Sequence, residues 1–184
     1  ADSEDMIKAI YRNSVRLQLL TSDILDVTRI ESETLRIDKE KFNLKEVIQG
    51  AVQDAHNQLA NGKVRFVYEP QDIYVQADRD RMTQVVSNLL DNATKFTKEG
   101  TITIATEKRG GQVIVSVQDT GTGIDLDIMP RLFSKFATKS DRGTGLGLFI
   151  SKSILEAHDG KIWCSNNPGG RGATFAFSLP ASQT

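Results

Sequence analysis

The sequence of 184 residues contains a single cysteine and two histidines. One cysteine excludes a disulfide within the chain, and so few Cys and His residues exclude the ligand sets of structural zinc sites. Lys and Arg together number 23 against 24 Asp and Glu, which leaves a formal charge of -1 and no overall field that attracts nucleic acid or an anionic membrane. No apolar run approaches the roughly 20 residues of a membrane-spanning helix. We therefore predict a cytoplasmic, globular segment that contacts neither nucleic acid nor membrane, although upstream regions of an intact protein can still anchor it.

The N-terminal region lacks glycine and proline from about Ser3 to Ile30, which predicts one long helix. Its heptad a and d positions are apolar except for Asn13, a pattern typical of a helix that packs on another helix. The alternative is an amphipathic helix that lies on its own domain, because further apolar residues widen this surface. The apolar a and d positions are Met6, Ile10, Leu17, Leu20, Ile24 and Val27.

The remaining sequence alternates between strand-like and helix-like segments. Period-2 patterns predict strands at 35–37, 64–69, 73–76, 101–108, 112–118, 161–165 and 174–179. Period-3.6 patterns predict helices at 44–60, 78–96 and 144–157, the first of them capped by Asn43. Several strands that pair antiparallel, combined with a few helices, indicate an α+β sandwich.

The predicted helix 78–96 carries a polar stripe beside its apolar face. Asn88, Asn92 and Lys95 share this stripe, whereas Phe96 is expected on the apolar face. Amide oxygens can ligate a hard cation such as magnesium, and a lysine beside them can reach a phosphate. Solvated surface is the alternative for the stripe taken alone.

Two glycine-containing segments provide further candidate binding residues. Asp119 ends a predicted strand and could accept a hydrogen bond from an exocyclic amine. The glycines that follow it let the backbone approach a flat ring. The alternative for this segment is a plain turn. The segment 143–148, GTGLGL, leads into a helix, whose first amides favour phosphate. It matches neither the dinucleotide fingerprint, because no strand precedes it, nor a Walker loop, because no Gly-Lys-Ser/Thr follows. Lys139 and Arg142 precede it as cations that could reach a polyphosphate.

Five blocks in order along the chain resemble the ATP-binding catalytic domain of sensor histidine kinases. They are QVVSNLLDNATKFT at 84–97, DTGTGI at 119–124, RLFSKF at 131–136, GTGLGL at 143–148 and GGRGATF at 169–175. The resemblance implies the Bergerat ATP-binding fold, a two-layer α/β sandwich with a mixed, mostly antiparallel sheet, preceded here by a long N-terminal helix. It also implies ATP and magnesium as ligands.

The resemblance assigns a role to each matching position. Asn88 would hold magnesium, Lys95 would reach phosphate, Asp119 would receive the adenine amine, and the hydroxyl of Thr174 would close the adenine pocket. Phe133 and Phe136 resemble the anchor of the ATP lid, and Lys135 stands where the family usually has arginine. The full set of implied ATP-binding residues is Asn88, Asn92, Lys95, Asp119, Gly121, Gly123, Lys139, Gly143, Thr144, Gly145, Leu146, Gly147, Leu148 and Thr174.

The resemblance also implies a domain organisation. Residues 1–33 are similar to the second helix of a dimerisation and phosphoacceptor domain, 34–43 to its linker and 44–184 to the ATP-binding domain. The phosphoacceptor histidine would lie outside this sequence, so no catalytic residue is assigned within it; His56 is expected at the surface and His158 in a structural role. The implied partners are the phosphoacceptor domain of the same kinase, a second copy of the chain and a response regulator.

The expected function is transfer of the γ-phosphate of Mg-ATP to that histidine, for relay to an aspartate of the regulator. One alternative is a nucleotide-gated binding module without phosphotransfer. The other is a related ATPase, which is disfavoured because hydrolysing relatives carry glutamate, a general base, where this sequence has Asn88.

Overall fold

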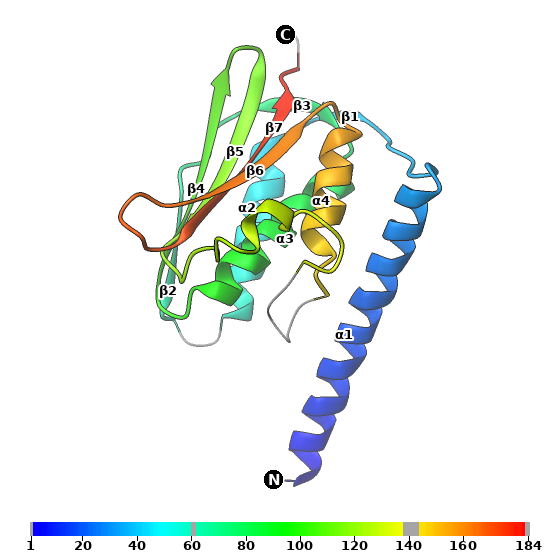
Figure 1. The fold of residues 1–184 in the computed structure, drawn as a ribbon, viewed down its shortest axis with the longest axis vertical. Helices are drawn as coiled ribbons and strands as arrows, with labels where there is room; N and C mark the ends of the chain where they lie inside the picture. Colours follow the sequence, from blue (N-terminus) through cyan, green and yellow to red (C-terminus); the bar gives the residue numbers. More distant parts are fainter. Residues whose placement is uncertain (1, 60–61, 138–143, 183–184) are drawn as a thin grey trace.

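The computed structural model describes residues 2–59, 62–137 and 144–182. Within this part of the chain, a long helix stands beside a sandwich of three helices on a sheet (Figure 1). The helices are α1 (Asp2–Glu31), α2 (Leu44–Gln58), α3 (Arg79–Phe96) and α4 (Gly147–Glu156), with a short 3-10 turn, η1 (Met129–Arg131). The strands are β1 (Glu40–Asn43), β2 (Val64–Tyr68), β3 (Tyr74–Ala77), β4 (Gly100–Arg109), β5 (Gln112–Asp119), β6 (Lys161–Asn166) and β7 (Ala173–Pro180).

The main sheet has the order β2-β4-β5-β7-β6, and β1 pairs with β3 in a separate two-stranded sheet. Only the pairing of β2 with β4 is parallel, whereas β4–β5, β5–β7 and β6–β7 are antiparallel. Helices α2, α3 and α4 cover one face of the main sheet (Figure 1). This arrangement confirms the predicted α+β sandwich with a mixed, mostly antiparallel sheet and a preceding helix.

The core lies between the helices and the sheet, and it follows from the two residue periods in the sequence. Apolar residues of α3 recur every three or four positions, and those of β4, β5 and β7 recur every second position, so both sets face the same interior. Their most deeply buried members include Met82, Val85, Leu89, Ile102, Val115 and Phe177, each with 0% of its surface exposed.

The ends of the helices follow local capping chemistry. The side chains of Asn43 and Asp78 accept backbone N–H groups of the first turns of α2 and α3, as Asn and Asp at this position commonly do. Helix α1 ends in a Schellman arrangement, in which the N–H of Glu33 donates to Ile30 O and that of Thr34 to Arg29 O. Glu33 has φ +55, a conformation that glycine usually occupies at this position.

Two predicted elements differ from the observed ones. Residues 35–37 form no strand, because no neighbouring strand pairs with them; the strand of this region is β1, which pairs with β3. Helix α4 begins at Gly147 rather than at Thr144, and residues 144–146 precede it as an irregular segment. Residues 34–39 of the linker are therefore irregular and lead into the paired strand β1, and the glycine-rich segment presents its amides before the helix begins.

Among the described residues, helix α1 packs on the rest of the chain through its C-terminal half (Figure 1). Val27 and Ile30 contact the core, whereas Met6, Ile10 and Tyr11 are more than 60% exposed. The predicted heptad stripe is thus divided, because Val27 is covered by the domain while Leu17 and Ile24 remain exposed. Among the described residues, no helix is both long and apolar enough to cross a bilayer.

Candidate nucleotide-binding site

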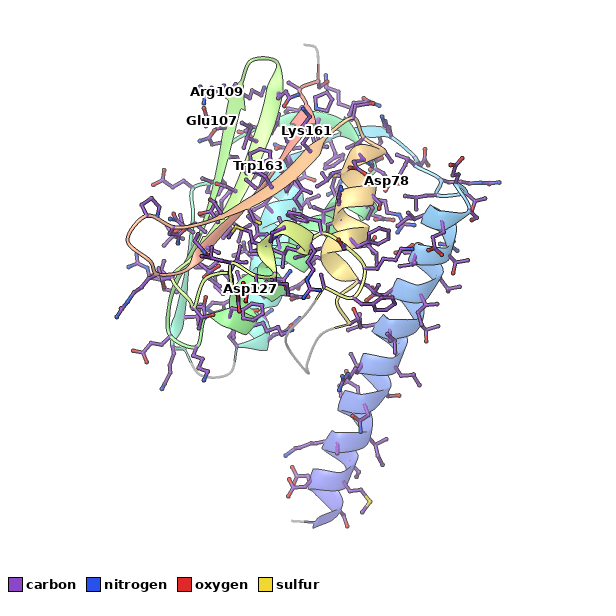
Figure 2. The ribbon with its side chains drawn as sticks, viewed as in Figure 1. Asp78, Glu107, Arg109, Asp127, Lys161 and Trp163 are labelled. Carbon is purple, nitrogen blue, oxygen red and sulfur yellow. The ribbon has the colours of Figure 1, made fainter. Side chains whose placement is uncertain are left out.

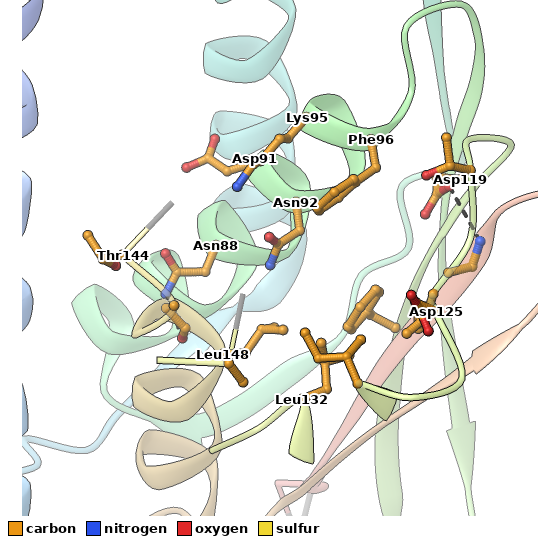
Figure 3. A pocket seen from close by; sticks show the side chains of 18 of the residues that line it. Asn88, Asp91, Asn92, Lys95, Phe96, Asp119, Asp125, Leu132, Thr144 and Leu148 are labelled. Atoms are coloured by element: carbon orange, nitrogen blue, oxygen red, sulfur yellow. Dashed lines mark hydrogen bonds between the residues drawn. The ribbon is translucent and has the colours of Figure 1, made fainter. Parts of the chain in front are cut away.

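A cavity of about 490 Å³ lies between α3, the segment after β5, the segment before α4 and one face of α1. Its volume is in the range of small-molecule sites in proteins. Figure 3 shows Asp119 at one side of this cavity and Asn88 with Thr144 at the other. The cavity therefore has two ends, which we call the Asp119 end and the Asn88 end.

At the Asp119 end, one carboxylate is held by backbone amides. Asp119 is 3% exposed, and its Oδ1 accepts hydrogen bonds from the N–H groups of Gly121, at 2.8 Å, and Ala173, at 3.4 Å. The Asp119 carbonyl accepts the Asn167 amide at 2.7 Å. Because both side-chain bonds go to Oδ1, Oδ2 is the atom directed to a ligand. Burial raises the pKa of this carboxyl, and the two backbone N–H donors partly offset that rise.

Three glycines near Asp119 have different physical roles. Gly172 has φ +77, and a Cβ atom there would overlap the Asp119 carbonyl oxygen. At Gly121, which does not line the cavity, a Cβ atom would overlap the Phe96 carbonyl oxygen instead. Gly123 lines the cavity at φ +75, and a Cβ atom there would lie 2.9 Å from Asn166 Oδ1. The first two glycines therefore allow close packing of the backbone, and only Gly123 borders the ligand space.

Apolar side chains form the walls next to Asp119. The sequence patterns did not identify most of them, because a wall of this kind needs no distinctive residue type. Phe96 was expected on the apolar face of its helix; it is the last residue of α3, is 41% exposed and lines the cavity. The apolar wall residues include Phe96, Ile124, Ile128, Leu132, Leu148, Ala173 and Phe175.

Asn88 has a fixed orientation at the other end of the cavity. Its Nδ2 donates to Gly147 O and to Ser151 Oγ, both at 3.2 Å. Since the amide nitrogen is used by these two bonds, Oδ1 remains for a ligand, and an amide oxygen is suited to a hard cation. Asn92 and Lys95 follow on the same face of α3 and also line the cavity, as predicted from their spacing. Asp91 lines it as well, which the sequence analysis missed.

The glycine-rich segment lies opposite Asn88 and adjoins the start of α4. Thr144, Gly145, Gly147 and Leu148 line the cavity, whereas Leu146 is 2% exposed and packs in the core. Among the described residues no side chain caps α4, so the first-turn amides, which have no partner within a helix, remain for an anion. The hydroxyl of Thr144 accepts the Leu146 N–H at 3.3 Å.

Several predicted site residues lie elsewhere or outside the described part of the chain. Lys139 and Gly143 fall in 138–143, which the structure does not describe. Thr174 does not line the cavity; its hydroxyl donates to Asn167 Oδ1 at 2.7 Å, and the neighbouring Ala173 faces the ligand space. Adjacent side chains of β7 face opposite sides, and a role of the Thr174 hydroxyl at the adenine pocket stays a prediction. Phe136 is 70% exposed rather than anchored.

Helix α1 supplies a wall of the cavity that the motifs did not predict. Arg16, Leu19 and Asp23 line the cavity, and the hydroxyl of Thr144 donates to Asp23 Oδ2 at 3.0 Å. One turn further along α1, Asp26 accepts hydrogen bonds from Arg81 Nη1 at 2.9 Å and from Gln84 Nε2 at 2.8 Å. Asp26 is 4% exposed, so this contact between α1 and α3 is shielded from water.

The fold and the two-ended cavity define a nucleotide-binding domain of the Bergerat type. The family model described as "Histidine kinase-, DNA gyrase B-, and HSP90-like ATPase" matches residues 77–183, and the chain belongs to this family. The sensor protein KdpD of Clostridium acetobutylicum is 38% identical over 184 residues, which cover 96% of this chain. The chain spans only 20% of the length of KdpD.

Solved structures of histidine kinases show the same architecture. Full-length ShkA in complex with AMPPNP matches 100% of this chain and 40% of its own, with 25% sequence identity and a TM-score of 0.82. Histidine kinase ThkA in complex with the response regulator TrrA matches 91% of this chain and 50% of its own, with 31% identity and a TM-score of 0.72. The chain is the ATP-binding portion of a protein of the sensor histidine kinase type.

Proposed function

We propose that the chain binds Mg-ATP in this cavity and transfers the γ-phosphate to a histidine outside this sequence. The observation that carries the proposal is the chemical difference between the two ends of the cavity. At one end a buried carboxylate stands among apolar walls; at the other, amides, an ammonium group and a helix N-terminus lie together. The first set suits a base with an exocyclic amine, and the second suits phosphates.

The Asp119 end would hold the adenine base. Oδ2 of Asp119 accepts the exocyclic amine, and the fixed backbone around Oδ1 keeps the carboxylate in place before the nucleotide arrives. Phe96, Ile124 and Leu148 flank the ring and exclude water, which strengthens the single polar contact in the apolar surroundings. Recognition of the base would therefore depend on one carboxylate, which backbone N–H groups of Gly121 and Ala173 hold in position.

The Asn88 end would hold the phosphates. The first-turn amides of α4 and the ammonium group of Lys95 bind phosphate oxygens, and Oδ1 of Asn88 would hold magnesium. The donor set fits this ion, because the two bonds made by Nδ2 direct the amide oxygen to the cavity. When bound, magnesium supplies neutralisation of the phosphate charge. The residues of the chain orient the terminal phosphate toward an incoming acceptor, so that catalysis is mostly a matter of position.

Asn88 favours transfer over hydrolysis. An amide cannot take a proton from water at neutral pH, so this position offers no general base. Its nitrogen is also engaged with Gly147 and Ser151, so the side chain is held as a fixed ligand. The site would therefore keep ATP intact until a nucleophile from another domain reaches it.

The acceptor and the regulator would come from outside the described chain. The exposed apolar residues on the N-terminal half of α1 suit a partner helix, in line with a dimerisation domain that carries the acceptor histidine. ThkA, a relative in complex with its response regulator, supports a similar partner here. We propose that the phosphoryl group passes to an aspartate of such a regulator.

Calorimetric titration with AMPPNP, with and without magnesium, tests the site. Asp119→Asn keeps an acceptor at Oδ1 but weakens the contact to the amine, and we expect affinity to fall by about 10- to 100-fold, since hydrogen bonds to charged groups contribute about 1.5–3 kcal/mol. The melting temperature should not fall, because the raised pKa of Asp119 means that its charged form is disfavoured in the fold. Asn88→Ala should abolish the part of the affinity that depends on magnesium.

Glu107→Gln is the matched control for loss of charge. Glu107 is exposed on the β4–β5 hairpin at the far end of the sheet (Figure 2), so its replacement should leave binding unchanged. Unchanged affinity in both site variants would refute the assignment. Transfer is tested by adding a separate helix hairpin with an acceptor histidine: acid-labile phosphate on that hairpin supports kinase activity, whereas steady phosphate release without it would indicate an ATPase.

A further inference from the structure

Helix α1 places a carboxylate at the Asn88 end of the nucleotide cavity. Arg16, Leu19 and Asp23 follow a spacing of three and four residues, so they share the face of α1 that lines the cavity. Asp23 is half-buried and is the residue of this face that hydrogen-bonds to the glycine-rich segment, through Thr144 at 3.0 Å.

The Thr144 hydroxyl has one proton, which it donates in a hydrogen bond to Asp23 Oδ2. The same hydroxyl oxygen accepts the N–H of Leu146, so its donor and one acceptor position are both occupied. A phosphate oxygen bound beside the first turn of α4 would need the same proton. The carboxylate and the phosphate are therefore rival acceptors for one donor.

The charge of Asp23 acts in the same direction. Burial is the main reason that the pKa of this carboxyl is raised; the bond from Thr144 lowers it and the nearby Asp26 raises it further. The Asp23 carboxylate lies at the end of the cavity where the triphosphate would lie. Arg16, two turns earlier on the same helix face, also lines the cavity and carries the opposite charge.

We propose that Asp23 lowers the affinity of the cavity for nucleotide phosphates while α1 is docked, so that phosphate binding and docking of α1 oppose each other. This inference rests on the proposed function, since it concerns the phosphates of the same ligand. Bound phosphate would weaken the docking of α1 without abolishing it, because Asp26 and an ion pair between Glu31 and Lys135 also hold α1 in place.

The first test compares Asp23→Asn with Asp5→Asn by calorimetry. Asp5 is an exposed carboxylate in the first turns of the same helix, so both variants lose one charge and only one of them changes the cavity. The ligands are AMPPNP without magnesium, AMPPNP with magnesium, and adenosine. We expect Asp23→Asn to bind metal-free AMPPNP about 3- to 10-fold more tightly than the wild type, because repulsion between a carboxylate and a phosphate is modest when water and salt screen it.

The three ligands separate the possible explanations. The gain for Asp23→Asn should be smaller with magnesium, which neutralises part of the phosphate charge, and absent with adenosine, which has no phosphate. Equal or weaker binding of metal-free AMPPNP by Asp23→Asn would overturn the inference, and a loss seen only with magnesium would instead make Asp23 a residue of the metal site. If neither the wild type nor the two variants bind AMPPNP, the proposed function itself fails.

The second test measures the reciprocal effect, since coupling between two binding events is mutual. Spin labels at Ser14→Cys on α1 and Lys98→Cys after α3, in a Cys164→Ser background, report the distance between α1 and the domain. Metal-free AMPPNP should increase the population of long distances, and the increase should be smaller when Asp23→Asn is added. An identical response with and without Asp23→Asn would overturn the linkage.

Discussion

The two ends of the cavity are built in different ways. At the Asp119 end, the carboxylate, its amide donors and the packed glycines all belong to β5, β7 and the segments that join them to neighbouring strands. At the Asn88 end, α3 and α4 meet a helix from another part of the chain, and the bond between Asp23 and Thr144 spans 121 residues of sequence. The Asp119 end is thus built within the sandwich, whereas the Asn88 end also includes residues of α1.

This difference indicates how regulation and recognition can be separated in one small domain. Recognition of a base requires a fixed donor or acceptor, and the interior of a sheet provides one. Control by another domain requires a contact that can be made and released, and a docked helix provides that. Variants at Gly172 and Asp26 each change one end of the cavity, and a variant at His158 changes neither.

The largest effect is expected at Gly172. Gly172→Ala would place a Cβ atom against the Asp119 carbonyl oxygen at φ +77, and we expect the free energy of unfolding to fall by about 2–4 kcal/mol, with loss of nucleotide binding. Urea unfolding measures the first effect and calorimetry the second. Gly169→Ala is the control, because φ there is +92 but no atom lies within 4 Å of a Cβ atom. A similar loss in both variants would mean that backbone strain alone, and not the contact with Asp119, decides stability here.

An intermediate effect is expected at Asp26. Asp26→Ala leaves Arg81 and Gln84 without their shared carboxylate, and we expect docking of α1 to weaken by about 1–3 kcal/mol. The spin-label pair on Ser14→Cys and Lys98→Cys measures the release. The same variant should bind metal-free AMPPNP more tightly while its affinity for adenosine stays unchanged. Asp26→Asn, which keeps one acceptor, should lie between the alanine variant and the wild type, and a change in adenosine affinity would argue against separate ends.

The smallest effect is expected at His158, which lies outside both ends. Its Nε2 accepts the N–H of Asp78 at 3.0 Å, and Nδ1 lies 2.7 Å from Ile154 O, so the ring is neutral with its proton on Nδ1. Burial lowers its pKa below the usual 6.5, and the unfolded chain therefore binds more protons in the pH range just below that value. The stability that this residue provides should be complete at pH 7.5 and should decrease as the pH falls below 6.5.

Urea unfolding of His158→Gln and the wild type at pH 7.5, 6.5 and 5.5 isolates this effect from other titrating groups. We expect the variant to be less stable by about 1 kcal/mol at pH 7.5 and the difference to shrink toward pH 5.5. A difference that stays constant with pH would contradict the neutral role of the ring. Nucleotide affinity at pH 7.5 should be the same in both proteins.

Parts of both ends of the cavity could be predicted from sequence, because motifs and residue spacing are local. Asp119 stands at a strand end next to glycines, and Asn88, Asn92 and Lys95 are spaced for one helix face, so motif and period gave the right placement. Ala173 lines the cavity and its neighbour Thr174 does not, because adjacent residues of a strand face opposite sides, and motif matching alone does not distinguish the two. The predicted strand at 35–37 failed because an extended pattern does not reveal whether a pairing partner is near.

The role of α1 in the site could not be predicted from its own sequence. Heptad spacing indicated a helix that packs on another helix, but it did not show which face would lie on the catalytic domain. Asp23 and Asp26 are ordinary polar positions in that pattern. Their partners, Thr144, Arg81 and Gln84, lie 55 to 121 residues away, so only the folded chain brings them together.

The anchored linker limits how far α1 can travel. Asp78 (Figure 2) accepts the N–H of Asp38 at 3.0 Å and that of Arg81 at 3.1 Å, so the chain is fixed to the start of α3 only a few residues after α1 ends. The intervening residues 32–37 span at most about 20–25 Å when fully extended. A released α1 therefore remains close to the cavity at an effective concentration of about millimolar or higher. At such a concentration weak individual contacts are sufficient for rebinding, and docking can be frequent and brief rather than permanent.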